Sequence, residues 1–156
     1  MAALSQLTDK NAQDFAQKIG DIFSSVPHLP KEWVAFLVKI APVLVMIGAI
    51  LSLISAFSFG FSGIYGLVRI VAALSSSILL FLAYKPLQEK QYEGWMYLFW
   101  STIISATESV IFVLLGRGFV GALLGIIIGF YILYELRPSY QGKIAALKKE
   151  VEKLTS

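Results

Sequence analysis

The sequence predicts an all-α, polytopic membrane protein whose four transmembrane helices form two hairpins. Four long apolar runs predict this fold class, because a helix needs about 20 apolar residues to cross roughly 30 Å of hydrocarbon. Hydrophobic residues make up 57% of the chain and charged residues 15%, a balance that favours a membrane protein. The 156 residues then divide into an N-terminal segment (1–30), a four-helix transmembrane domain (31–138) and a C-terminal tail (139–156).

The N-terminal segment is expected to form an amphipathic helix followed by a proline-bounded linker. Apolar residues recur at helical spacing from Leu4 to Phe23, as on one face of a helix. Thr8 or Asp9 can cap the helix start, and the prolines at 27 and 30 end it before the first span. Because the polar face is not lysine-rich, we expect apolar burial in the interface or against the other helices to hold this helix.

The four spans are predicted over residues 33–57, 63–84, 94–115 and 118–136. Residues 58–62 form a turn that contains a glycine and no charge, and little more than residues 116–118 joins the last two spans. Such short connections are typical of tight hairpins. The middle connection, 85–93, is longer and charged. This difference favours two hairpins joined by one exposed loop into a four-helix bundle, with Pro42 kinking the first span.

Basic residues flank only one end of the predicted spans. Arg117 is the exception at the other end. Lysine and arginine favour cytoplasmic loops, and tyrosine and tryptophan favour the membrane interface. The aromatic residues at the basic end are Trp33, Tyr84, Tyr92, Trp95, Tyr97, Trp100, Tyr131 and Tyr134. We therefore expect a protein of the bacterial inner (plasma) membrane with both termini in the cytoplasm.

Two stripes of small residues follow helical spacing. The fourth span carries Gly121, Gly125 and Gly129, and the third carries Ser101, Ser105 and Ser109. Small residues let membrane helices approach closely, which is how they gain packing energy where lipid supplies no hydrophobic drive. The stripes predict helix packing inside the chain. An oligomer interface and a substrate path are the alternatives.

Arg69 in the second span and Glu108 in the third are predicted to lie at matching depth. A rise of about 1.5 Å per residue places each roughly 10 Å from the outer end of its span. A lone charge in hydrocarbon costs about 2.5–3.5 kcal/mol on insertion scales, so each should face the other, water or the protein interior. One reading is a structural ion pair; the other is a proton or cation site at Glu108 with Arg69 as counter-ion. Lys39 and Glu135 are expected at the interface.

The tail shows a short heptad pattern. Ile144, Leu147, Val151 and Leu154 have the spacing of an a/d seam, which is typical of coiled coils. Fewer than two heptads are too short to associate alone in water. The tail is therefore either a solvated amphipathic segment or a helix for self-association or partner docking. These residues also resemble synthetic coiled-coil heptads.

The segment from Gly118 to Tyr140 resembles a segment that recurs in uncharacterised four-span bacterial membrane proteins. This resemblance covers about a sixth of the chain and implies no activity. Small multidrug-resistance transporters share the four-span size, but the first span here has Lys39 where their essential glutamate is expected. No functional residue is carried over from them.

Function is less constrained than fold. No catalytic motif occurs, so an enzyme is not expected, and no cofactor or nucleic-acid partner is predicted. His28, the single histidine, has no metal-ligand spacing around it, so it is expected to be an ordinary surface residue and no metal site is predicted. The favoured hypothesis is an assembly protein surrounded by membrane lipid, associating with itself or with a membrane or cytoplasmic protein. The rival is a small transporter or channel that uses Glu108 and Arg69.

Overall fold

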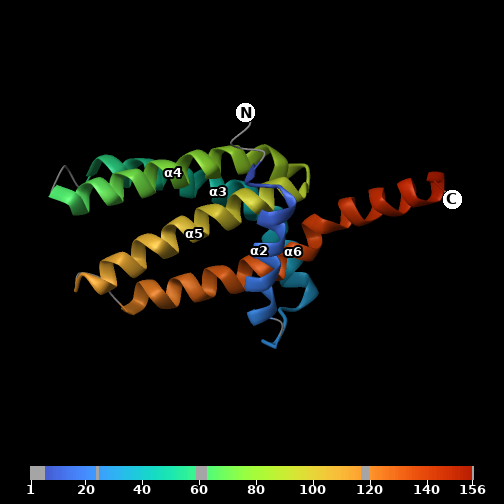
Figure 1. The fold of residues 1–156 in the computed structure, drawn as a ribbon, viewed down its shortest axis with the longest axis horizontal. Helices are drawn as coiled ribbons and strands as arrows, with labels where there is room; N and C mark the ends of the chain where they lie inside the picture. Colours follow the sequence, from blue (N-terminus) through green and yellow to red (C-terminus); the bar gives the residue numbers. More distant parts are fainter. Residues whose placement is uncertain (1–5, 24, 59–62, 117–119, 156) are drawn as a thin grey trace.

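The protein is all-helical in the parts that the structure describes. The computed structural model describes residues 6–23, 25–58, 63–116 and 120–155, with side chains of the last range visible up to 142 except at 120 and 122. The helices in these ranges are α2 Lys10–Phe23, α3 Lys31–Ser58, α4 Gly63–Gln88, α5 Tyr92–Leu114 and α6 Val120–Thr155 (Figure 1). The predicted all-α class is confirmed. Most of the predicted turns at 58–62 and 116–118 lies outside the described residues.

Three of these helices are long and apolar enough to cross a membrane: α3, α4 and α5. They contain 28, 26 and 23 residues, and about 1.5 Å of rise per residue makes even 23 residues longer than a bilayer core. Their outer surfaces carry large apolar side chains, among them Phe57, Ile64 and Leu114, which are 76%, 72% and 79% exposed. An apolar surface of this extent indicates contact with lipid. A fourth span in the first half of α6 stays a prediction.

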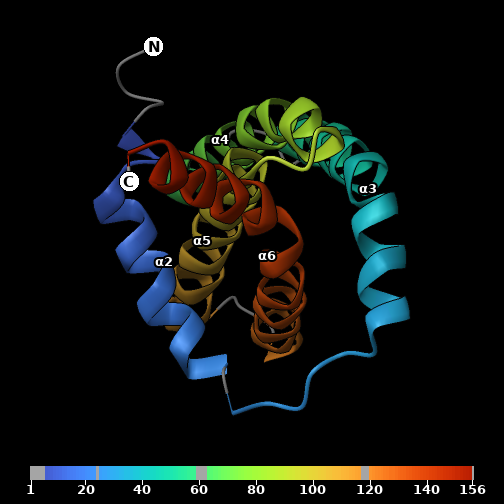
Figure 2. The same cartoon turned by 90° about the vertical axis from the view of Figure 1, so that its right-hand side faces the viewer.

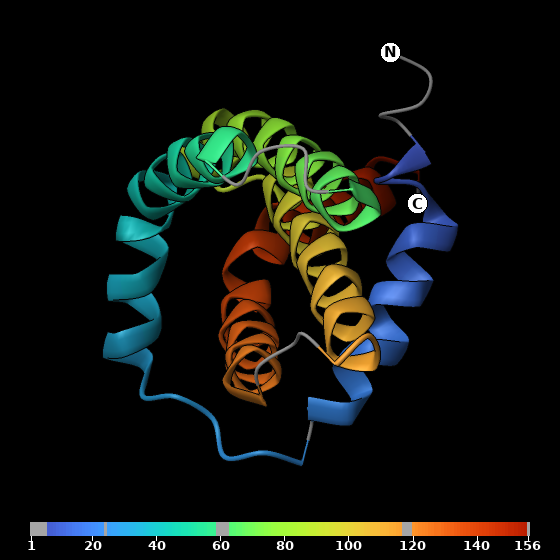
Figure 3. The same cartoon turned by 90° about the vertical axis from the view of Figure 1, so that its left-hand side faces the viewer.

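Helices α3 to α6 pack in chain order and leave an open arc. α4 packs extensively on both α3 and α5, and α5 packs on α6, whereas α3 and α6 contact each other only slightly. Seen along their length, the four helices follow this arc (Figure 3). The largest interface joins α4 to α5, which come from different predicted hairpins. A closed four-helix bundle is therefore not supported.

The connection between α4 and α5 is tighter than the sequence suggested. α4 continues through Pro86 to Gln88, and only residues 89–91 separate it from α5. The backbone N–H of Gln91 donates to the Pro86 carbonyl at 2.8 Å, and Lys90 adopts a positive φ of 52°. A Cβ on Gly94 would stand 2.7 Å from the backbone nitrogen of Leu87. The absent side chain at Gly94 is what lets the two helices approach so closely.

The N-terminal part of the chain runs across the direction of the other helices. α2 and the first turns of α3 lie on opposite sides of α5 and α6, joined by the linker below them (Figure 2). α3 then turns to run with α4, and Pro42 lies inside it, as expected of a proline kink. Asp9 caps α2 by accepting a hydrogen bond from the Ala12 N–H at 3.0 Å. We call α2, residues 25–30 and α3 up to Pro42 the collar.

α6 continues well beyond the predicted fourth span. The sequence placed a break at Pro138, but Pro138 lies inside a helix of 36 residues that leaves the packed helices at its C-terminal end (Figure 1). A proline removes one N–H and crowds one carbonyl, and here the chain accommodates both without ending the helix. The tail is thus helical and continuous with the last span. The side chains of its predicted seam, Ile144, Leu147, Val151 and Leu154, lie outside the described residues.

Candidate functional site

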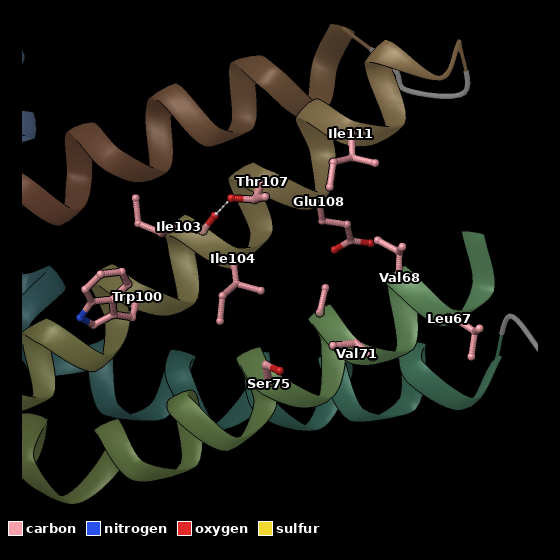
Figure 4. A pocket seen from close by; sticks show the side chains of 11 residues that line it. Leu67, Val68, Val71, Ser75, Trp100, Ile103, Ile104, Thr107, Glu108 and Ile111 are labelled. Atoms are coloured by element: carbon pink, nitrogen blue, oxygen red, sulfur yellow. Dashed lines mark hydrogen bonds between the residues drawn. The ribbon is translucent and has the colours of Figure 1, made fainter. Parts of the chain in front are cut away.

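Glu108 lines an open groove between α4 and α5. The groove has a volume of about 550 Å³, with walls that are mainly aliphatic (Figure 4). The Glu108 carboxylate points from α5 toward Val68 of α4 (Figure 4). Thr107 also lines the groove, but its hydroxyl donates to the Ile103 carbonyl at 2.9 Å and is locally satisfied. The groove therefore offers one carboxylate in an apolar setting, suited to an acyl chain or an amphiphilic cation.

Arg69 acts on this carboxylate from α4. Both side chains are half-buried, and the positive charge of Arg69 interacts electrostatically with Glu108. No described residue donates a hydrogen bond to the Glu108 carboxylate. The expected proximity of the two charges is consistent with this arrangement, and their role, structural or functional, stays a prediction.

The two small-residue stripes are not brought together along their length. A Cβ on Gly125 or Gly129 would meet no atom within 4 Å. Ser101 is buried but Ser105 is exposed and Ser109 only half-buried, while Gly121 is half-buried. Gly125 and Gly129 thus face open space and not another helix of the described chain.

The tight small-residue interface lies instead between α3 and α4. The Ser77 hydroxyl donates to the Ala49 carbonyl at 2.9 Å, and the Ser52 hydroxyl donates to the Ala73 carbonyl at 3.1 Å. The buried alanines at 49, 56 and 73 let the two backbones come close enough for these bonds. Sequence spacing missed this interface because its small residues are serines and alanines scattered on two helices, without a glycine repeat.

Side chains of α5 and α6 hold the collar by its backbone. The Trp100 indole N–H donates to the Leu7 carbonyl at 2.7 Å. Three further contacts come from α6: the Tyr134 hydroxyl donates to the Ala16 carbonyl at 2.5 Å, the Tyr131 hydroxyl donates to the Pro27 carbonyl at 2.6 Å, and the Glu135 carboxylate accepts from the Leu29 N–H at 2.9 Å. Donors on two helices therefore meet the collar along its whole described length.

His28 is more than an ordinary surface residue. Its Nδ1 lies 2.7 Å from Oε1 of Glu135, although the His28 side chain is 74% exposed and that of Glu135 only 10%. Glu135 thus joins α6 to both His28 and the following N–H in the linker. The sequence gave no sign of this pair because the two residues are 107 positions apart.

The best-packed part of the molecule is an aromatic cluster where the collar crosses α5 and α6. Trp95, Phe99 and Tyr140 are fully buried there. The Trp95 indole N–H donates to the Leu133 carbonyl at 2.7 Å, and its ring stacks on Phe99 at 5.6 Å between centroids. Burial raises the pKa of Tyr140 to about 12. The predicted interfacial aromatics are therefore also structural residues.

Arg137 lies against this cluster as a cation among rings. Its guanidinium carbon is 5.1 Å from the Trp95 ring centre, 5.9 Å from that of Tyr134 and 6.0 Å from that of Tyr92. Its Nη2 donates to the Tyr92 hydroxyl at 3.3 Å. The sequence analysis treated Arg137 only as a topology signal. An arginine directly after a span rich in tyrosine was the available clue, because cation–π contacts favour arginine over aromatic faces.

Comparisons of the chain with protein-family models, with curated proteins and with solved structures give no match.

Proposed function

We propose that this chain is a four-span protein of the bacterial inner membrane that acts by associating with further copies of itself. Three apolar helices and their exposed apolar surfaces support membrane residence. The apolar first half of α6 would supply the fourth span. The basic residues gathered at the end where α4 meets α5 favour a cytoplasmic position for that end and for both termini.

The open glycine face of α6 is the observation that carries self-association. Gly125 and Gly129 have nothing within 4 Å of an added Cβ, so alanine would fit at either position inside one copy. Glycine costs about 1 kcal/mol relative to alanine inside a helix, and no contact within the described chain offsets that cost. A second α6 packed on this face would, because glycine permits close approach of two backbones.

Cysteine cross-linking in native membranes tests this proposal. The chain has no cysteine, so Gly125→Cys introduces a unique thiol on the glycine face. Val71→Cys is a matched control: it is 63% exposed on α4 and lies at about the same predicted depth. Oxidation should give a covalent dimer with Gly125→Cys and not with Val71→Cys. Equal cross-linking of both variants, or of neither, would exclude an interface at the glycine face.

The tail is a second handle for association. Tyr140 is fully buried, so a truncation must spare it. We expect a chain that ends at Gly142 to stay folded and to lose part of its oligomer, measured by light scattering in detergent. An unchanged oligomer would remove the tail from the assembly.

Transport is the alternative function, and the groove at Glu108 is the observation that favours it. A carboxylate facing an apolar groove can carry a proton or bind a cation. Proteoliposomes of Glu108→Gln are compared with those of Glu89→Gln, which changes an exposed residue of the α4–α5 turn. Assembly without transport predicts no proton or cation flux in any variant. A flux that only Glu108→Gln abolishes would establish transport instead.

A further inference from the structure

A small polar cleft lies between α2 and α6, beside the aromatic cluster. Its volume is about 200 Å³, and the polar side chains that line it are those of Gln17, Asp21, His28, Tyr131, Tyr134, Glu135 and Arg137. α2 crosses α6 at this point (Figure 1), where Tyr134 bonds the α2 backbone. The cleft therefore combines both signs of charge at one place.

The guanidinium of Arg137 is nearly buried and incompletely partnered. Only 9% of Arg137 is exposed, and its Nε has no hydrogen-bond partner among the described residues. Its hydrogen bond to Tyr92 is long, at 3.3 Å, and no described carboxylate lies within ion-pair distance. Ring faces attract a cation, but they leave the N–H groups without acceptors. Arg137 thus offers its remaining donors to an anionic oxygen.

Gly20 keeps space open at this guanidinium. A Cβ there would stand 3.3 Å from Nη1 of Arg137 and 2.7 Å from the Tyr134 ring. The absent side chain leaves room along the wall of the cleft where α2 faces Arg137. Phosphate is the ligand whose geometry best matches a guanidinium, because two N–H groups can bond two oxygens in parallel.

The other charges of the cleft argue against a simple anion. Asp21 and Glu135 both line it. Glu135 is already bonded to His28 and to the Leu29 N–H, whereas the Asp21 carboxylate accepts only one printed side-chain bond, from Gln17 at 3.0 Å. A ligand that carries only negative charge would be repelled by these carboxylates. A ligand with both a phosphate and an ammonium group satisfies Arg137 and Asp21 together.

We propose that this cleft binds the headgroup of an aminophospholipid, with the phosphate on Arg137 and the ammonium group on Asp21. Arg137 directly follows the predicted fourth span, at the end where interfacial aromatics gather, so the cleft lies at headgroup depth. A phosphoethanolamine group is small enough for the cleft, and its ammonium group donates hydrogen bonds that a choline group lacks. The inference rests on the membrane residence in the proposed function and not on self-association.

Native mass spectrometry of the full chain in detergent tests the proposal. Phosphatidylethanolamine, phosphatidylcholine and phosphatidylglycerol with identical acyl chains are titrated separately. Phosphatidylethanolamine should bind at least about tenfold more tightly than the other two, since a charge-assisted hydrogen bond is worth more than a tenfold change in affinity. Equal binding of the three lipids would overturn the proposal. Soluble phosphoethanolamine should compete weakly; if it bound as tightly as the lipid, the lipid assignment would be wrong.

Three variants locate the binding. Arg137→Gln should lose the tight binding. Asp21→Asn should retain lipid binding but lose the preference over phosphatidylcholine, and because Asp21 is exposed this variant should stay folded even if Arg137→Gln does not. Lys85→Gln removes one exposed charge near the same end of the helices and should change neither affinity nor preference. A preference that survives Asp21→Asn, or is lost in Lys85→Gln, would contradict the proposed site.

Discussion

Removing three hydrogen-bond donors should release the collar from the helices that hold it. Trp100→Phe, Tyr131→Phe and Tyr134→Phe each keep an aromatic ring and delete one N–H or O–H. The three donors contact backbone carbonyls of the collar at 2.7, 2.6 and 2.5 Å. The stacking of Phe23 on Tyr134, at 5.6 Å between ring centres, is retained by phenylalanine. The triple variant therefore isolates the polar contribution to docking.

The expected effect is about 3 kcal/mol. A hydrogen bond contributes about 1 kcal/mol net, and the three act on one connected segment, so their losses combine in a single docking equilibrium. Each 1.4 kcal/mol is about a factor of ten. The undocked fraction of the collar should therefore rise about a hundredfold in the triple variant and about fivefold in each single variant.

Hydrogen exchange measured by mass spectrometry in lipid nanodiscs gives this fraction. Amides of α2 should exchange about a hundredfold faster in the triple variant if opening limits exchange, while those of α4 and α5 stay unchanged. Tyr84→Phe is the matched control, because its hydroxyl bonds only the nearby Gln88 side chain at 2.9 Å and does not touch the collar. If α2 exchange in the triple variant equalled that of the control, lipid contact alone would hold the collar and the hydrogen bonds would not.

Further predictions concern stability. Gly94→Ala should lower the free energy of unfolding by about 1–3 kcal/mol through overpacking, because the new Cβ would meet backbone at 2.7 Å, whereas Gly142→Ala has nothing within 4 Å; thermal unfolding in detergent compares them, and equal melting temperatures would refute the tight α4–α5 contact. Ser77→Ala should cost about 0.6 kcal/mol, a usual value for a hydrogen bond between membrane helices; no loss of stability would show the bond to α3 to be dispensable. Tyr140→Phe removes a buried hydroxyl that has no partner among the described residues, so stability should rise by about 1 kcal/mol at neutral pH. As the pKa of Tyr140 is raised from 10.0 to about 12 in the fold, its neutral form stabilises the fold below pH 10, and that contribution is lost as the pH rises to about 12; unfolding curves across this range should show a loss in the parent chain that Tyr140→Phe reduces.

Periodicity and composition predict much of this fold. Long apolar runs mark α3, α4 and α5 because lipid requires continuous apolar surface, and the structure has helices there. The helix over Lys10–Phe23 also follows its predicted start, with Asp9 as the cap. These features are local, so the sequence carries them directly.

The remaining features depend on contacts between distant residues. Pro138 suggested a helix end, but a single proline inside a long helix is tolerated where its neighbours pack well. Glycine spacing suggested where helices approach, yet Gly125 faces open space and Ser77 bridges α3 and α4. Arg137 and the bonds to the collar are set by how α2 crosses α6, which no local pattern specifies.

Cysteine accessibility in intact cells tests the membrane-spanning arrangement most directly. Glu89 lies in the α4–α5 turn and Leu115 follows the end of α5, and both are exposed. If α5 crosses the inner membrane in the proposed direction, a reagent that cannot cross that membrane should label Leu115→Cys from outside and reach Glu89→Cys only after the membrane is permeabilised. Labelling of both residues from the same side would contradict a membrane-spanning α5 and the proposed topology with it.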